Sequence, residues 1–320
     1  MAERRHKGIM RRFELPTWVL IVAIYGGWGL LTYFWTALPW PLLLIAGAWL
    51  IAWHMSLQHE VLHGHPTKRQ ALNDAIGFPP LSFWLPYRIY RDSHLAHHND
   101  TRLTDPLDDP ESHYLTAEAY ARLGAAGRLL RDVYNTFPGR VLIGPAWNIG
   151  RFLIAEGRLV ASGWTGRRGI WLRHMIGVIA IGAWLVLICE IPLWQYLLLA
   201  VYPGYGLAMV RAFAEHRAEE EPEHRTAIVE NTPIFGLLFL HNNLHVVHHD
   251  RPCLPWYAIP AEYRANRTDV LTQNRGLLYN GYFDVARRYF FARHHHPLHP
   301  AYNPLPESGL PTTEAVRTSP

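Results

Sequence analysis

Cysteine is scarce in this 320-residue sequence, which contains only Cys189 and Cys253. Two cysteines so far apart cannot form a disulfide framework, a cysteine-rich zinc site or the ligand set of an iron–sulfur cluster. Charge is also sparse, because only 18% of the residues are Asp, Glu, Lys or Arg and the formal net charge is +4. Nucleic-acid-binding domains usually carry a stronger and more clustered basic bias, so we expect no nucleic-acid partner.

Charge is almost absent from four long apolar runs, residues 17–35, 40–58, 170–187 and 192–210, in which Arg173 is the one charged residue. Each run is long enough to cross a hydrocarbon core of about 30 Å at about 1.5 Å per residue. A soluble protein with four buried helices is the alternative, but such helices seldom run so far without a charge. The sequence therefore predicts an all-α integral membrane protein with four transmembrane helices.

The positions of Lys and Arg predict how this protein is oriented. None of the 30 Lys and Arg residues lies in the short links at residues 36–39 and 188–191, which turn the four runs into two helical hairpins. By the positive-inside rule, both termini and the segments 59–169 and 211–320 are expected in the cytoplasm. We expect a single domain over residues 1–320, with a cytoplasmic helical cap and a disordered tail over residues 300–320.

Histidine, by contrast, is abundant, with 20 residues. Many of these histidines gather where the apolar runs end. Three clusters have helical spacing of i, i+3 or i+4, which places imidazoles on one face of a helix. They are His59-Glu60-Val61-Leu62-His63, His94-Leu95-Ala96-His97-His98 and His245-Val246-Val247-His248-His249, and His216 follows the fourth run.

Neutral imidazoles are suited to ions such as iron, zinc, copper and nickel, and nine rings are enough for two ions. For His6, His113, His224 and the run of residues 294–296 we expect ordinary surface or core roles. The first cluster is also the HExxH pattern of zinc metalloproteases, but a protease has no use for the other two clusters. A metal transporter would place ligands within the spans, where His54 and His174 are the only histidines.

The three histidine boxes, in this order and beside these apolar runs, resemble the membrane fatty acid desaturase superfamily. The resemblance covers roughly residues 18–260 and includes Leu254-Pro255-Trp256-Tyr257 after the third box. It implies a non-haem di-iron centre that uses O₂ as co-substrate and removes hydrogen from an unactivated C–H bond. The metal ligands that it implies are His59, His63, His94, His97, His98, His216, His245, His248 and His249.

Residues next to the boxes are candidates to hold the ligating rings. Some members of the superfamily have an Asn four residues before the histidine that His216 matches, where this chain has Ala212. His65 is an additional histidine that we leave without a role. The run of residues 104–110 is expected to be an Asx/Pro turn rather than a ligand set. The candidates for hydrogen bonds to the ligands are Glu60, Asp92, Asp100, Glu215, His241 and Asp250.

The sequence has no GxGxxG motif opening a helix and no haem-binding motif of a fused cytochrome, so the electrons must come from a separate carrier. We expect a ferredoxin or similar protein with its reductase, docking near Arg91, Arg102 and Arg251. The expected reaction is insertion of a double bond into a fatty acyl or similar hydrophobic chain, in contact with membrane lipid. Hydroxylation or ketone formation on a lipid, carotenoid or small molecule is the alternative, because the same boxes serve several reactions.

Overall fold

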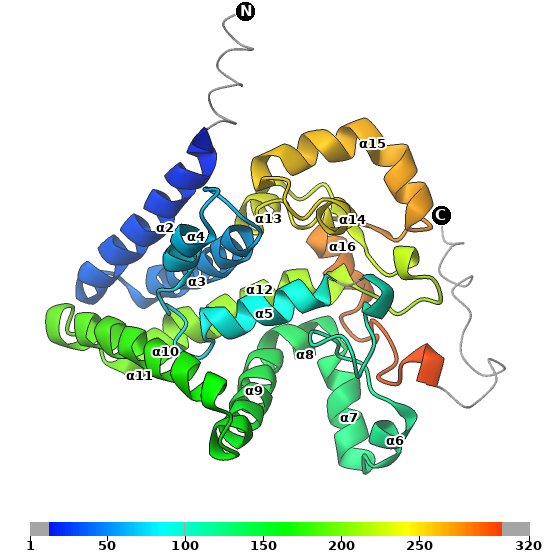
Figure 1. Ribbon diagram of the computed structural model, residues 1–320, viewed down its shortest axis with the longest axis horizontal. Coiled ribbons are helices and arrows are strands. Elements are labelled where there is room, and N and C mark those ends of the chain that lie inside the picture. The colour runs from blue at the N-terminus through cyan, green and yellow to red at the C-terminus, as the bar shows by residue number, and fades with distance from the viewer. Residues whose placement is uncertain (1–12, 99, 303–320) are drawn as a thin grey trace, which may run out of the picture.

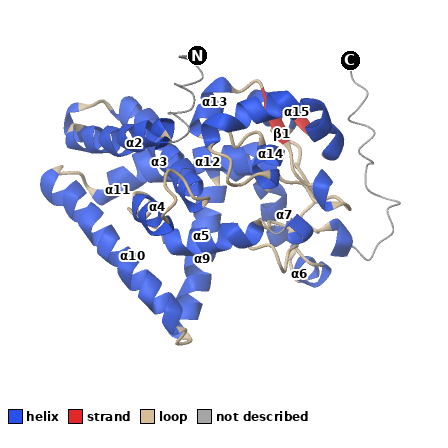
Figure 2. Ribbon diagram, turned by 45° about the horizontal axis from the view of Figure 1, so that its top comes forward, coloured by secondary structure: helices blue, strands red, loops and turns tan. Residues whose placement is uncertain are grey.

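The structure is a computed structural model that describes residues 13–98 and 100–302, leaving aside the side chains of Asp100 and Thr165 (Figure 1). The basic N-terminal segment with His6 and the expected disordered tail beyond Tyr302 lie outside the described residues. The chain is mostly helical (Figure 2). Within the described residues, β1 (Ile228–Glu230) and β2 (Leu278–Asn280) form one short parallel pair, which the all-helical expectation missed.

Four helices are long and apolar enough to cross a membrane, as expected from the four runs. Helix α10 is continued by the π-helical turn η3, and α12 is preceded by α11 and the π-helical turn η4. The four candidate spans cover residues 15–33, 40–62, 166–188 and 193–215. Their elements are α2 (Leu15–Tyr33), α3 (Trp40–Leu62), α10 (Thr165–Ala183) with η3 (Trp184–Ile188), and α11 (Leu193–Tyr196) with η4 (Leu197–Val201) and α12 (Tyr202–Glu215).

Two of these helices continue past the ends that the sequence predicted. Helix α3 ends at Leu62 instead of residue 58, and α12 ends at Glu215 instead of residue 210. The polar residues that follow residues 58 and 210 end the two apolar runs. None of these residues breaks a helix, so the helical hydrogen bonds continue. His59 therefore lies on the last turn of α3 itself rather than after it.

Helix α3 lies at the centre of the packing and contacts α2, η4 and α12. The helices α2 and α10 present large apolar side chains outward, among them Val19, Val22, Ile176 and Ile179, each between 62% and 69% exposed. Continuous apolar surface of this kind is found where a protein faces lipid or another protein. The exposed faces therefore fit the hydrocarbon core of a membrane.

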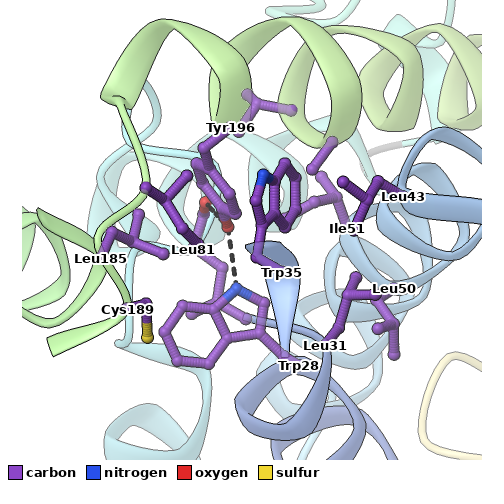
Figure 3. Packing of buried hydrophobic residues seen from close by; sticks show 13 residues of the cluster. Trp28, Leu31, Trp35, Leu43, Leu50, Ile51, Leu81, Leu185, Cys189 and Tyr196 are labelled. Atoms are coloured by element: carbon purple, nitrogen blue, oxygen red, sulfur yellow. Dashed lines mark hydrogen bonds between the residues drawn. The ribbon is translucent and has the colours of Figure 1, made fainter. Parts of the chain in front are cut away.

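Several polar side chains between the spans have partners within the protein, which a low-dielectric environment favours. The indole of Trp28 donates to Tyr196 Oη at 2.9 Å, and Tyr196 Oη donates to the carbonyl of Leu81 at 2.8 Å (Figure 3). Trp184 Nε1 donates to Thr32 Oγ1 at 3.0 Å. These bonds tie the first, third and fourth spans and the segment around Leu81 into one packed core.

Among the other helices, α4, α5 and α13 contact α3, while α8 and α9 contact α12. In chain order, those before the third span are α4 (Gln70–Gly77), α5 (Tyr87–His97), η2 (Asp100–Arg102), α6 (Ala117–Ala121), α7 (Ala125–Tyr134), α8 (Phe137–Leu142) and α9 (Gly144–Ala161). Those after the fourth span are η5 (Pro222–His224), α13 (Pro233–Leu238), α14 (His245–Asp250), η6 (Trp256–Ala258), α15 (Ile259–Gln273), α16 (Gly281–Arg288) and η7 (Pro300–Tyr302).

A glycine allows α3 and α12 to approach closely, and its replacement is expected to destabilise the protein. A Cβ atom on Gly204 would lie 2.6 Å from Ile51 Cβ and 3.0 Å from the carbonyl oxygen of Ala48. Gly204→Ala should therefore force the helices apart and cost roughly 1–3 kcal/mol. A thermal melt in detergent should show a lower melting temperature. Gly26→Ala is the control, since nothing lies within 4 Å of its Cβ position, and equal melting of both variants would contradict this packing.

Candidate metal centre

The first histidine box is placed by the end of α3. His59 is on its last turn and His63 is its C-cap residue, so the spacing of four residues brings both rings to one side of the helix. Their ring centroids lie 4.9 Å apart. Both residues are buried, at 5% and 7% exposure. Buried imidazoles at the end of a membrane helix need polar partners, and the other two boxes supply them.

The other boxes lie on short helices that converge on this point. Helix α5 carries His94 and His97 and ends at the cap residue His98, while α14 begins at His245. His216 is the C-cap residue of α12. The structure thus brings together all nine histidines that the sequence singled out as ligands.

The nine rings form two groups, in each of which every ring offers one nitrogen that lies within 4.8 Å of those offered by the others. The second and third boxes are each divided between the groups, because adjacent residues of a helix point in different directions. The first group is His59, His63, His94, His98 and His248, and the second group is His97, His216, His245 and His249.

Distances within the groups fit metal coordination. In the first group, His94 Nε2 lies 3.1 Å from His63 Nε2 and 3.0 Å from His98 Nε2. In the second group, His216 Nε2 lies 3.1 Å from His97 Nε2 and 3.0 Å from His245 Nε2. Two nitrogens that each bind one ion at about 2.1 Å, at roughly a right angle, stand about 3 Å apart. Several Nε2 atoms at this spacing are therefore arranged as ligands for a common cation.

The opposite ring nitrogens have partners that fix this orientation. His97 Nδ1 lies 2.9 Å from Asp109 Oδ1, His94 Nδ1 lies 3.2 Å from Glu111 Oε1, and His245 Nδ1 lies 2.9 Å from Asn242 Oδ1. An oxygen at this position accepts the Nδ1 proton, so the lone pair of Nε2 is available to a metal. These contacts assign a positioning role to Asp109, Glu111 and Asn242.

Sequence reasoning missed all three of these partners. The run of residues 104–110 does form the expected Asx turn, because Asp105 Oδ1 accepts hydrogen bonds from the amides of Leu107 and Asp108. The same turn also delivers Asp109 to His97, a contact that the turn chemistry alone does not show. The only local signal for Asn242 is its position one helical turn before His245.

Of the proposed partner carboxylates whose side chains the structure describes, Glu215 lies nearest to a box histidine, with Oε1 3.3 Å from His245 Nδ1. Glu60 Oε1 instead accepts a hydrogen bond from the amide of Trp256. The side chain of Asp100 lies outside the described residues.

Three further candidates lie elsewhere in the structure. Asp92 pairs with Arg88 at 2.9 Å, and Asp250 Oδ1 accepts a hydrogen bond from Gln273. The ring of His241 stacks on Trp256 at a centroid distance of 5.9 Å. The contacts described for these three side chains are thus with residues outside the boxes, because adjacency in sequence does not decide where a side chain points.

Burial keeps most of these imidazoles neutral. Burial and the neighbouring histidines lower the pKa of His63 to about 2, and lower the pKa values of His98 and His248 as well. His97 is the exception: burial opposes its charge, but Glu111 and Asp109 outweigh it and raise the pKa to about 9. Neutral rings are the form that binds a metal, and the carboxylates beside His97 balance part of the charge of a bound cation.

A cavity of about 670 Å³ reaches the second group. His97 and His216 border it, whereas no ring of the first group does. Its walls include Trp84, Phe152 and Met209, which make part of the lining apolar. This volume is typical of pockets that enclose a small ligand. A hydrophobic molecule in the cavity would thus lie next to the second group only.

Buried imidazoles in two groups at the ends of membrane helices define a membrane protein with a candidate metal centre. A family model for fatty acid desaturases matches residues 34–282, most of the chain, and so the chain belongs to the fatty acid desaturase family. This family, with the four apolar helices, makes the chain an integral membrane protein of an oxidoreductase family that usually uses non-haem di-iron. No curated protein matches the chain.

Proposed function

We propose that the chain is an O₂-dependent di-iron desaturase that introduces a double bond into a fatty acyl or similar hydrophobic chain. The observation that carries this proposal is the division of nine buried histidines into two groups whose ring nitrogens converge. Imidazole is a good ligand for iron, and two groups of four and five rings suit two ions. The donor set therefore fits the di-iron centre that the family usually contains.

When bound, two iron ions would supply the activation of O₂ and the removal of hydrogen from an unactivated carbon. The protein holds the ligands through α3, α5, α12 and α14, and it orients His97 through Asp109. Burial of the rings keeps bulk water from the centre. The cavity beside His97 and His216 would position the chain to be oxidised.

The metalloprotease alternative is disfavoured by the position of its required base. In the HExxH mechanism the glutamate acts on a metal-bound water. Here Glu60 Oε1 accepts a hydrogen bond from the amide of Trp256 at 3.0 Å. The other seven histidines of the two groups would also have no role in a protease.

Electrons would come from a separate carrier, such as a ferredoxin with its reductase. Of the arginines that the sequence suggested for docking, Arg102 and Arg251 are 56% and 59% exposed. Arg251 pairs with Glu262 at 2.7 Å, and Arg91 is largely covered and lies 3.4 Å from Asp74. An acidic carrier would be attracted to these arginines and would compete with their intramolecular carboxylates. Because salt screens the attraction between exposed charges, docking should weaken steeply as salt is added.

The decisive experiment is turnover under ¹⁸O₂ by protein reconstituted in lipid with a ferredoxin system and NAD(P)H. Loss of two hydrogens from the lipid, with the label recovered only in water, supports desaturation. Label in the product would assign hydroxylation instead. Equal consumption of substrate under argon without reductant would refute the oxygen-dependent assignment.

Replacing Asp109 tests the positioning of His97. Asp109→Asn keeps an oxygen for the turn but removes the negative charge beside His97 Nδ1. We expect metal affinity or turnover to fall by about 10–100-fold, the usual effect of losing a carboxylate behind a metal-binding histidine. The measurement is iron content and initial rate of purified protein. Asp108→Asn is the matched control, since Asp108 is 56% exposed, and an equal loss in both variants would contradict the assigned role.

We propose that both links between paired spans face away from the cytoplasm. Ala37 and Glu190 are exposed in these links. In a background without the native cysteines, Ala37→Cys and Glu190→Cys should react with a membrane-impermeant maleimide added outside cells. Arg251→Cys should react only after the membrane is opened. Protection of either link from the external reagent would overturn this orientation.

A further inference from the structure

The cavity beside the metal centre has a strongly basic wall that the proposed function does not use. Arg140, on α8, borders this cavity and is 1% exposed. Its guanidinium lies between two aromatic rings, 4.2 Å from the centroid of Tyr134 and 5.6 Å from that of Phe213. It donates to the carbonyl of Tyr134 and to Asn135 Oδ1, both at 3.3 Å. These partners are neutral, so they leave its charge uncompensated.

Two more arginines increase the positive potential of this wall. Arg131 is 7% exposed, whereas Arg151 borders the cavity and is itself exposed to solvent. Burial, followed by the charges of Arg151 and Arg140, lowers the pKa of Arg131 to about 10. Among the described residues, no carboxylate forms an ion pair with any of these three arginines. Buried charge of one sign is costly unless a counter-ion offsets it.

A buried ring nitrogen without a hydrogen-bond partner also borders this cavity. His295 Nε2 is buried and has no hydrogen-bond partner. The ring is held by Tyr114, at a centroid distance of 4.4 Å, and its Nδ1 lies 3.0 Å from His294 Nδ1. A buried ring nitrogen without a partner is rare unless a ligand completes it. An N–H at this position would donate to an acceptor in the cavity.

One arginine that borders the cavity does have a carboxylate partner. Arg211 also borders the cavity, but its Nε lies 3.0 Å from Glu215 Oε1. Its charge is therefore balanced within the protein. The buried charge without a carboxylate partner on this cavity wall therefore belongs to Arg140, because Arg151 is exposed to solvent.

We propose that the substrate is a free carboxylic acid whose carboxylate binds Arg140 and His295, while its hydrophobic part extends toward His97 and His216. This inference rests on the proposed function and names the head group of its substrate. A guanidinium binds a carboxylate through parallel hydrogen bonds, and a monoanion matches Arg140, the buried arginine on the cavity wall that has no carboxylate partner among the described residues. Esters and thioesters lack that anion. Phe152 and Met209 offer apolar contact to the rest of the molecule.

Binding of dodecanoate tests this head group without requiring turnover. Full-length protein in lipid nanodiscs is equilibrated with radiolabelled dodecanoate, and unlabelled methyl dodecanoate, dodecan-1-ol and dodecyl phosphate are added as competitors. The acid should bind at least about 10-fold more tightly than the ester and the alcohol, because only the acid forms charge-assisted hydrogen bonds. Equal affinity of acid and ester, or tighter binding of the phosphate, would overturn the proposal.

Substitutions of single arginines test where the carboxylate of the ligand binds. Arg140→Gln should weaken dodecanoate binding about 10-fold or more and leave dodecan-1-ol unchanged. Arg158 also borders the cavity and is exposed, so Arg158→Gln is the matched control and should keep the preference for the acid. Loss of the preference in Arg158→Gln but not in Arg140→Gln would refute the assignment. If Arg140→Gln does not fold, the comparison of competitors on the unmodified protein still decides.

The same preparation separates this inference from the proposed function. Iron content and O₂-dependent turnover report on the metal centre, whereas dodecanoate binding reports on the basic wall. Protein that contains iron and consumes O₂ with reductant, but binds acid and ester equally, would refute only the head group. Protein that prefers the acid but contains no iron would refute the di-iron assignment and leave the carboxylate site standing.

Discussion

His98→Ala and His249→Ala are each expected to reduce turnover to the level of membranes that lack the protein. His98 Nε2 lies 3.0 Å from both His94 Nε2 and His248 Nε2, so within the first group it lies between another ring of the second box and a ring of the third box. His249 belongs to the second group, and its ring stacks on that of His98 at a centroid distance of 4.5 Å. Each substitution removes one ring from a different group.

Iron content and product formation of the purified variants are the measurements for this prediction. Each variant should lose iron from the group that it alters, because a buried site with a missing ligand holds its ion less tightly. His224→Ala is the matched control, since His224 belongs to neither group. Full activity in His98→Ala or His249→Ala would show that two complete groups are not needed.

Ala212→Phe is expected to abolish turnover while the iron remains bound. Ala212 is half-buried, borders the cavity and lies one helical turn before His216. A phenyl ring at this position would enter the cavity where it meets the second group. A hydrophobic chain in the cavity would then be kept from the second group, and a displacement of about 1 Å already costs about 100-fold in rate.

Two measurements distinguish a blocked cavity from a damaged protein. Iron content and melting temperature of Ala212→Phe should stay close to those of the unmodified protein, while product formation disappears. Ala180→Phe, on the exposed face of α10, adds the same ring outside the cavity and should retain activity. Turnover by Ala212→Phe at the normal rate would show that substrate does not approach through this cavity.

Much of the fold could be predicted from the sequence because membrane helices carry their signal locally. Each apolar run corresponds to one of the four candidate spans, although α3 and α12 extend to Leu62 and Glu215. The boundaries were less predictable than the helices, since the end of an apolar run is not the end of a helix. The strands β1 and β2 were missed because a three-residue strand pairs through contacts distant in sequence.

The sequence by itself determined the chemical type of the centre, because spacings of three and four residues place histidines on one side of whichever helix carries them. Only the tertiary structure decided how α3, α5, α12 and α14 divide nine rings into two groups. It alone also brought Asp109, Glu111 and Asn242 behind the rings and placed Arg140 on the cavity wall. Ligand type follows from local periodicity, whereas partners and cavities depend on packing between segments far apart in the chain.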